Sequence, residues 1–411
     1  MMMLVVLIGA QDWLVSLVVP SFIVFGVEYA MLIVLLGYFW AERRQVPKLL
    51  WVYLLIVAIG IIRGFALAEG YGDYRALAIY TLAYLTPLFI VYASSPARFQ
   101  RMSRLALICI PFWLFITYPL IGYDYVARLL SIVPFFLIFL GEYRTLDKFY
   151  IIGLLLVFSL VIMSSARAAF TRFMISAVLA LVLSFLPRLC NRAILGVVTI
   201  GVFVAPFVLF TLAAFYGINI LEQQEQKYGG EYVVEIDTEH VQFKDMAGDT
   251  RTFIYEEAAR SAIINDYIWM GHSLSRGYAS ASFGDEDVVS KARGERSSSE
   301  VHVVNIFTHM GVVGFVAFAL LLLFGALKAV FKGQSPEVRV LGFWIVCRWA
   351  LCWFEERTAF DIGQIYLWAA IAICYSERFL KMDREEFKEF IRGCFYTFQV
   401  GEEGKHRTIG Q

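Results

Sequence analysis

Charged residues are scarce in this 411-residue sequence: Asp, Glu, Lys and Arg make up 17% of it, and hydrophobic residues make up 60%. Soluble domains average roughly 25% charged and 45–50% apolar residues, so this composition excludes an ordinary soluble protein. The formal net charge is +0, which gives no global electrostatic attraction to nucleic acid. The mean hydropathy of +0.68 indicates that a bilayer is the natural solvent of the chain.

The sequence also has few groups that could hold a metal ion or form a disulfide. It has six cysteines, and none of them lies in its one long polar segment, roughly residues 217–299. No cysteines have the spacing of a zinc site, and the histidines form no HxxxH pair. We therefore expect no metal and no cofactor, and a polar segment that is held by packing rather than by disulfides.

Long apolar runs follow one another along most of the chain. A helix needs about 20 mostly apolar residues to cross a hydrocarbon core of roughly 30 Å. We expect about twelve such helices, at residues 3–20, 22–40, 50–68, 76–93, 105–121, 125–141, 149–164, 168–187, 193–216, 300–327, 338–354 and 362–377. The sequence thus predicts an all-α polytopic membrane protein, without the internal repeat that many transporters have.

Lys and Arg are concentrated in every second connection between these spans. The clearest examples are Arg43, Arg44, Lys48, Arg98, Arg101, Arg104, Arg188 and Arg192. The positive-inside rule places such short basic loops, and here both termini, in the cytoplasm. The chain then divides into spans one to nine (1–216), a large periplasmic loop (217–299), spans ten to twelve (300–377) and a cytoplasmic tail (378–411) with an amphipathic helix near residues 383–388.

The large loop contains three local patterns. Residues 232–243 alternate partly between apolar and polar side chains, which fits a hairpin and a solvated loop equally well. Asp249 is placed as the N-cap of an amphipathic helix. Gly271, Gly277 and Gly284 follow, and we expect them to open a flexible stretch. The apolar residues of the predicted helix, which we expect to lie on the membrane face, are Phe253, Ile254, Ala258, Ala262 and Ile263.

Several arginines near the predicted periplasmic side could bind a phosphate. Ionisable residues at membrane depth are costly and commonly functional, and the arginine fork binds phosphate bidentately. Arg63 ends span three, Arg167 lies at the turn between spans seven and eight, and Arg348 lies within span eleven. Arg251 lies in the first turn of the loop helix, where the helix dipole favours an anion. For each arginine the alternative is that it reaches lipid headgroups or pairs with a carboxylate.

The segment that enters span ten brings ionisable side chains to the mouth of the membrane domain. Glu300 and His302 are both placed where a catalytic base could act. Each has an alternative: Ser297 and Glu300 have the spacing of a capping box, and His302 could simply be hydrogen-bonded at the helix start. Asn305 and His309 share the helix face of His302, which indicates a polar cavity, because lipid would not tolerate these side chains.

Four of these features carry a resemblance to a known family. They are the large loop late in the chain; Ser-Ala-Arg at residues 165–167; Asp-Thr-Arg at 249–251, which opens the helix leading to Trp-Met-Gly at 269–271; and the run into span ten that ends Gly-Val-Val-Gly at 311–314. With them the chain resembles the family of O-antigen polymerases (Wzy type) and O-antigen ligases, which are multi-span glycosyltransferases.

The resemblance implies a GT-C-like enzyme of the bacterial inner membrane whose active site faces the periplasm. It implies inverting, metal-independent transfer of a glycan from undecaprenyl pyrophosphate within membrane lipid, with flippase and chain-length regulator proteins as partners. Arginines would hold the pyrophosphate, and a base would deprotonate the acceptor hydroxyl. The catalytic residues would be Glu300 and His302, the pyrophosphate-binding residues Arg63, Arg167, Arg251 and Arg348, and the supporting residues Asn305, His309 and Arg276.

One departure from the ligase pattern favours polymerisation. Ligases have a His-Asn pair eleven residues before the first glycine of the Gly-Val-Val-Gly run; here that position holds Glu300, followed two residues later by His302. We therefore expect polymerisation of lipid-linked repeat units into surface polysaccharide such as O-antigen or exopolysaccharide. The alternatives are ligation of glycan to lipid A core, transport of a lipid-linked glycan by a flippase, and a receptor that uses the loop for sensing.

Overall fold

The structure, a computed structural model, describes residues 21–121, 127–162, 167–216, 233–235, 241–243, 250–280, 293–356 and 358–395. Its helices are α3 (Ser21–Ala41), α4 (Lys48–Leu67), α5 (Tyr71–Leu85), η1 (Thr86–Leu88), α6 (Phe89–Ala93), α7 (Pro96–Ile121), η2 (Leu130–Ile132), α9 (Val133–Leu137), η3 (Leu140–Glu142), α10 (Thr145–Ile162), α11 (Arg167–Phe185), η4 (Pro187–Cys190), α12 (Arg192–Tyr216), α14 (Thr250–Ile264), α16 (His302–Lys332), α17 (Pro336–Leu351), α18 (Ile362–Tyr375), α19 (Glu377–Leu380) and α20 (Arg384–Arg392). Its strands form two short antiparallel pairs, β1 (Val233–Glu235) with β2 (Val241–Phe243) and β3 (Tyr278–Ala279) with β4 (Glu295–Arg296).

The described residues form an all-α membrane protein. Five of their helical stretches are long and apolar enough to cross a membrane: Ile23–Ala41, Lys48–Leu67, Tyr71–Ala93, Arg192–Leu212 and His302–Lys332. Helical structure occupies each predicted span from residue 22 onward, while the predicted span 3–20 lies outside the described residues. The total of about twelve crossings and the GT-C-like arrangement stay predictions.

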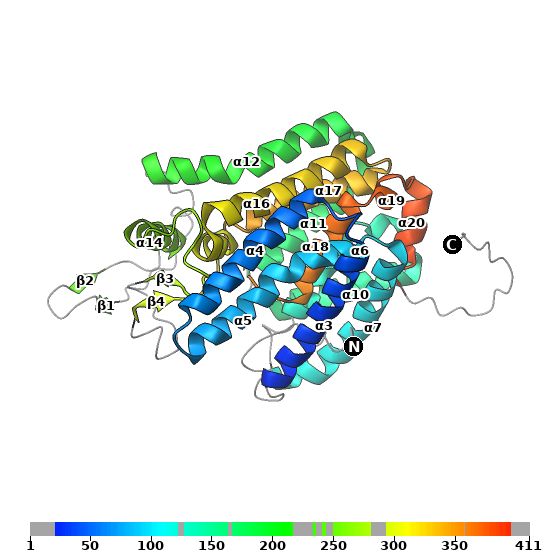
Figure 1. The fold of residues 1–411 in the computed structure, drawn as a ribbon. Coiled ribbons are helices and arrows are strands. Elements are labelled where there is room, and N and C mark those ends of the chain that lie inside the picture. The colour runs from blue at the N-terminus through cyan, green and yellow to red at the C-terminus, as the bar shows by residue number, and fades with distance from the viewer. Residues whose placement is uncertain are drawn as a thin grey trace.

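Helix α18 forms the centre of the bundle. Its residues from Ile362 to Cys374 are all buried, and it packs against α6, α16 and α17. Helix α16 packs in turn against α17 and α4 (Figure 1). Helix α12 lies at the edge of the bundle and exposes apolar side chains such as Val197, which is 73% exposed. Such a surface is unfavourable in water but suits contact with lipid.

The connections that we predicted to be cytoplasmic meet at one end of the bundle. There Arg384 pairs with Glu142 at 2.8 Å and with Glu337 at 3.3 Å, and Arg98 pairs with Glu42. Helix α14 and the four strands lie toward the opposite end (Figure 1). We call these two regions the tail end and the loop end. The Lys/Arg pattern therefore correctly predicted which connections lie at the same end of the bundle.

The local predictions for the loop and the tail are largely confirmed. Strands β1 and β2 pair as a hairpin, and α20 forms with a capping box. Helix α14 packs on α16 and β3 through three buried residues spaced four apart, Ile254, Ala258 and Ala262. Ile263 was wrongly placed on that face, since it is 68% exposed. The proposed N-cap Asp249 and the side chain of Phe253 lie outside the described residues.

Helix α16 is interrupted at Gly311, whose φ of 64° and ψ of −165° are not helical. The segment that follows α14 supplies hydrogen-bond acceptors at this break. The carbonyl of Ile268 accepts from the Val312 N–H at 2.9 Å, and that of Trp269 accepts from the Val313 N–H at 3.2 Å. The loop and the helix therefore share backbone hydrogen bonds where a broken membrane helix would otherwise leave them unmade.

The glycines of the loop have a different role from the flexible one that we expected. Gly271 has a φ of +71°, and a Cβ there would collide with the backbone of α16. The next residue, His272, donates its N–H to the Thr308 carbonyl at 2.6 Å. A Cβ on Gly277 would likewise collide with the backbone of β4. These glycines allow two backbones to touch, and Gly284 lies outside the described residues.

The sidedness of the chain can be tested by cysteine labelling. Ser298 at the loop end and Glu385 at the tail end are both exposed, whereas all six native cysteines are buried. We expect a membrane-impermeant maleimide to label Ser298→Cys in intact spheroplasts, and to label Glu385→Cys only after permeabilisation. The unsubstituted protein is the control. Labelling of Glu385→Cys in intact spheroplasts would overturn the predicted topology.

Candidate functional site

Two arginines share one buried carboxylate at the loop end. Arg348, near the end of α17, is 2% exposed, and its Nη2 lies 2.7 Å from Oε1 of Glu356. From α11, Nε of Arg172 lies 3.3 Å from Oε2 of the same carboxylate. Gln364 Nε2 also donates to Glu356 Oε1, at 3.1 Å. We call Arg172, Arg348 and Glu356 the arginine cluster.

Electrostatics explain why this carboxylate is ionised. Burial opposes ionisation of Glu356, but the charges of Arg172 and Arg348 outweigh burial and hold the pKa of Glu356 below its usual range. Burial raises the pKa of the nearby Asp361, whose side chain caps α18 by accepting from the Gln364 N–H. The arginine cluster itself has two guanidinium groups and one carboxylate, and Asp361 lies nearby.

His302 begins α16 next to the arginine cluster. It is 5% exposed, its Nδ1 lies 2.7 Å from Oγ1 of Thr358, and it is close enough to Glu356 for their charges to interact. Asn305 Nδ2 donates to Thr358 Oγ1 at 3.2 Å and to the Ser299 carbonyl at 2.9 Å. The start of α16 is thus tied both to the turn between α17 and α18 and to the loop that precedes it.

Glu300 lies in a different environment. Its side chain is 57% exposed and pairs with Arg296 at 3.3 Å. The alternative role in a capping box is wrong, because Val301 is the N-cap of α16 and no side chain caps that helix start. Glu300 is therefore a surface residue at the mouth of α16, while His302 lies inside.

The polar face of α16, which we predicted to line a polar cavity, is buried in protein: His302, Asn305 and His309 are all buried. His309 is fully buried, its Nδ1 lies 2.8 Å from the Tyr84 hydroxyl, and its ring lies 4.1 Å from the Tyr80 ring. Tyrosine rings and Thr358 thus pack along this face. A cavity of about 520 Å³ lies at the tail end, with Glu42, Arg98, Lys328 and Glu377 among its lining residues.

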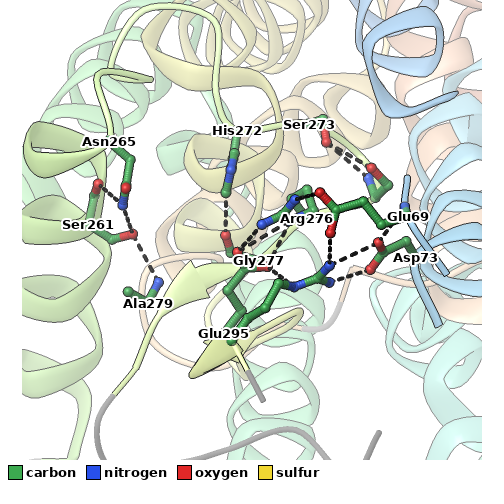
Figure 2. Close-up of polar contacts among 12 residues, drawn as sticks. Glu69, Asp73, Ser261, Asn265, His272, Ser273, Arg276, Gly277, Ala279 and Glu295 are labelled. Carbon is green, nitrogen blue, oxygen red and sulfur yellow. Dashed lines mark hydrogen bonds and ion pairs between the residues drawn. The ribbon is translucent and has the colours of Figure 1, made fainter. Parts of the chain in front are cut away.

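A second group of charges fastens the loop to the turn between α4 and α5. Arg293 binds Asp73 through Nη2 at 2.5 Å and Nη1 at 3.2 Å, and its Nη1 also reaches Glu69 at 3.2 Å. Arg276 binds Glu295 at 2.5 and 3.0 Å, and Glu69 at 3.7 Å. Figure 2 shows Glu69, Asp73, Arg276 and Glu295 close together. We call Glu69, Asp73, Arg276, Arg293 and Glu295 the loop clamp.

The structure separates the arginines that we grouped from the sequence. Arg348 lies in the arginine cluster, whereas Arg276 lies in the loop clamp. Arg63 donates to the carbonyls of Met270 at 2.6 Å and His272 at 3.4 Å, so it holds the loop backbone. Arg167 and Arg251 are the first and second residues of α11 and α14, and their side chains lie outside the described part of the chain.

Sequence reasoning missed several residues that the structure brings to these sites. Glu356 and Thr358 lie in the short polar run between the last two predicted spans, and that run was the signal that could have found them. Arg172 lies five residues after Arg167 in the sequence, and this closeness was the signal that could have found it. Arg293 gave no signal, because it lies among other charged residues of the loop.

Among the described residues, no group of three or more His, Cys, Asp or Glu side chains is arranged to hold a metal ion.

These features define a helical membrane protein with a buried, positively charged cluster and a histidine beneath a polar loop. Residues 152–319 match the family model described as O-antigen ligase (Wzy_C), and this match supports the predicted resemblance to the O-antigen ligase and polymerase family. Members of this family are membrane glycosyltransferases of the ligase or polymerase type. No curated protein matches the chain. No solved structure matches it either.

The loop clamp makes a prediction about stability. Asp73 is 2% exposed, so Arg293→Gln should leave a buried carboxylate without its main cation, at a cost of about 3–5 kcal/mol. We expect a clear fall in the melting temperature of the purified protein in detergent, and partial recovery in the Arg293→Gln/Asp73→Asn double variant. Lys388→Gln is the control, because its pairing with the exposed Glu385 is worth at most about 1 kcal/mol. Equal melting temperatures for the Arg293 and Lys388 variants would contradict the role of the clamp.

Proposed function

We propose that the protein polymerises oligosaccharide repeat units linked to undecaprenyl pyrophosphate, at the periplasmic face of the bacterial inner membrane. The observation that carries the proposal is the position of His302 beside the arginine cluster, in a chain that matches the O-antigen ligase family. This places a proton acceptor next to a site with excess positive charge. Flippase and chain-length regulator proteins are the expected partners.

The arginine cluster suits a pyrophosphate leaving group. Two guanidinium groups face one carboxylate, so these three side chains keep one net positive charge that favours an anion. The side chain of Arg172 is 16% exposed, which leaves part of this cation accessible from outside the bundle. Arg167 and Arg251, at the first turns of α11 and α14, add backbone N–H groups and helix dipoles that favour phosphate. Arg63 instead holds the loop backbone by donating to the carbonyls of Met270 and His272.

The proposed reaction is a direct displacement. The hydroxyl oxygen of the acceptor sugar attacks the anomeric carbon of the donor glycan, while the bond from that carbon to the pyrophosphate oxygen breaks. Attack opposite to the leaving group inverts the anomeric configuration. The hydroxyl proton passes to the base, and the arginines stabilise the negative charge that develops on the pyrophosphate. Positioning and charge stabilisation are enough, since the donor is already activated.

We assign the base to His302 rather than to Glu300. The buried imidazole is held through Nδ1, and it lies close enough to Glu356 for the carboxylate to stabilise an imidazolium. Glu300 is largely exposed and paired with Arg296. A base that works in water loses the advantage of a desolvated site.

A ligase would use the same donor chemistry, but one feature of the sequence favours polymerisation over ligation. The position eleven residues before Gly311 holds Glu300 rather than the His-Asn pair of ligases. A flippase would need outward arginines but no base, so the buried His302 favours an enzyme. The products separate the three functions: a polymerase lengthens lipid-linked glycan, a ligase transfers it to lipid A core, and a flippase moves it unchanged.

The assignment of the base can be tested with isosteric variants. We expect purified His302→Gln to lengthen lipid-linked glycan about 10²–10⁴-fold more slowly than the unsubstituted protein in proteoliposomes. Glu300→Gln is the matched control, and it should keep most of the activity because it removes only an exposed ion pair. The reverse pattern would move the base to Glu300. Full activity in both variants would remove this segment from the chemistry.

The pyrophosphate-binding arginines generate a second test. We expect Arg167→Ala, Arg251→Ala and Arg172→Ala each to reduce chain extension severely while the amount of protein in the membrane stays unchanged. Lysine at these positions should restore little, because it keeps the charge but loses the bidentate fork. The measurement is the length of surface polysaccharide on gels together with an immunoblot of the membrane fraction. Normal polymer in the alanine variants would exclude these residues from the donor site.

A further inference from the structure

The cavity at the tail end is lined by four separate parts of the chain. These are the turn between α3 and α4, the turn between α6 and α7, the end of α16, and the turn between α18 and α19. The lining residue Lys328 lies near the end of α16, whereas His302 begins that helix, so the cavity is separate from the proposed transferase site. Its volume of about 520 Å³ suits a small ligand, since binding pockets range over roughly 300–1,000 Å³.

The cavity lies at the level where three of the candidate membrane spans end. Its lining residue Glu42 directly follows one of these spans, Pro47 precedes the next, and Ser94 follows the third. Trp40 and Trp51 lie near the same helix ends and are 62% and 39% exposed. Exposed tryptophans at the ends of membrane helices are typical of the headgroup layer of a bilayer. The cavity is therefore at the height of lipid headgroups.

An arginine fork fixes a carboxylate on one side of the cavity. Arg98 Nη2 donates to Glu42 Oε2 at 2.9 Å, and Arg98 Nη1 donates to the other carboxylate oxygen. Arg98 Nε also donates to the Tyr92 carbonyl at 2.8 Å, which holds the guanidinium in place. A carboxylate has about four lone-pair sites, so Glu42 can still accept from a further donor. Its side chain is 25% exposed, which leaves room for that donor.

A second ion pair lines the cavity from α16 and α19. Lys328 Nζ lies 2.8 Å from Glu377 Oε1 and donates to the Tyr375 carbonyl at 2.7 Å. The Glu377 side chain is 62% exposed, so its carboxylate also keeps acceptor sites. Arg378 is exposed and forms no ion pair with another described residue. The charged lining thus contains three cations and two carboxylates, and Arg378 is the cation that can bind a new anion.

This mixture of charges selects the kind of headgroup. Basic pockets between membrane helices on the cytoplasmic side commonly bind anionic lipids, but here a purely anionic group would also face two carboxylates. A headgroup with both a phosphate and an ammonium places a partner beside each sign of charge. A primary ammonium has three hydrogens to donate, whereas a trimethylated one has none. The lining therefore favours phosphoethanolamine over phosphocholine and over phosphoglycerol.

We propose that this cavity binds the headgroup of phosphatidylethanolamine from the leaflet at the tail end. Arg378 binds the phosphate, and the ammonium donates to the carboxylates of Glu42 and Glu377. The bound headgroup contacts all four parts of the chain that line the cavity, so it stabilises their packing at this end of the bundle. This lipid is a structural ligand that takes no part in glycosyl transfer.

Lipid selectivity of the full-length protein is the first test. We expect native mass spectrometry of delipidated protein in detergent, with equal amounts of each lipid, to show about tenfold more bound phosphatidylethanolamine than phosphatidylcholine. The reason is that only the primary ammonium forms charge-assisted hydrogen bonds with the carboxylates. Equal binding of the two lipids would overturn the proposal. Stronger binding of phosphatidylglycerol would also overturn it, and would identify an anionic-lipid site.

Two exposed side chains allow the cavity itself to be tested. Glu377→Gln should lower phosphatidylethanolamine binding about tenfold and leave phosphatidylcholine binding unchanged, whereas Arg378→Gln should lower both. Glu385→Gln and Lys388→Gln are the controls, because they alter an ion pair at the same end that does not line the cavity. Unchanged lipid binding in both cavity variants would overturn the proposal.

A thermal measurement separates the lipid from a soluble source of the same headgroup. Phosphatidylethanolamine should raise the melting temperature of the unsubstituted protein more than phosphatidylcholine does, because a ligand that binds only the folded state stabilises it. Glycerophosphoethanolamine carries the same headgroup without acyl chains and should have little effect at the same concentration. An equal rise with glycerophosphoethanolamine would overturn the assignment to a lipid.

Discussion

The backbone of α16 leaves the helical path at Gly311, and the loop supplies hydrogen-bond acceptors at that point. The carbonyls of Ile268 and Trp269 accept from the first two N–H groups after the break, and the N–H of His272 returns a bond to the helix before it. Gly311 lies within the candidate membrane span His302–Lys332, where hydrocarbon would offer no water to replace these bonds. The position of the loop backbone is therefore coupled to that of α16, and the start of α16 carries His302.

The loop end uses the same residue types for two purposes, which can be told apart by counting charges. The loop clamp has two arginines against three carboxylates, and its arginines are engaged in holding chain segments together. The arginine cluster has two arginines against one carboxylate. Saturated arginines stabilise structure, whereas an unbalanced buried pair attracts an anion. This difference separates Arg276 from Arg348, although the sequence suggests phosphate binding or its support for both.

The sequence predicts the membrane helices well because bilayer thickness sets the length of each apolar run. It also predicts His302 and Arg348, since ionisable groups at membrane depth stand out in any hydropathy profile. Thr358 and Glu356 were not found from the sequence, because they lie in a short connection where hydropathy gives no contrast. The flexible role expected for Gly271 and Gly277 fails for a related reason: close contact between backbones depends on tertiary packing, which local composition does not encode.

The shared hydrogen bonds at the break of α16 also limit how the lipid-linked substrate of the proposed function could enter. A segment that opened like a lid between Ile268 and His272 would expose backbone groups of both the loop and the helix at membrane depth, each at a cost of several kcal/mol. This part of the loop therefore behaves as a fixed wall. Under the proposed function, a polyprenyl tail would then arrive sideways from the bilayer and the acceptor glycan from the aqueous side, so donor and acceptor would take separate routes to the site.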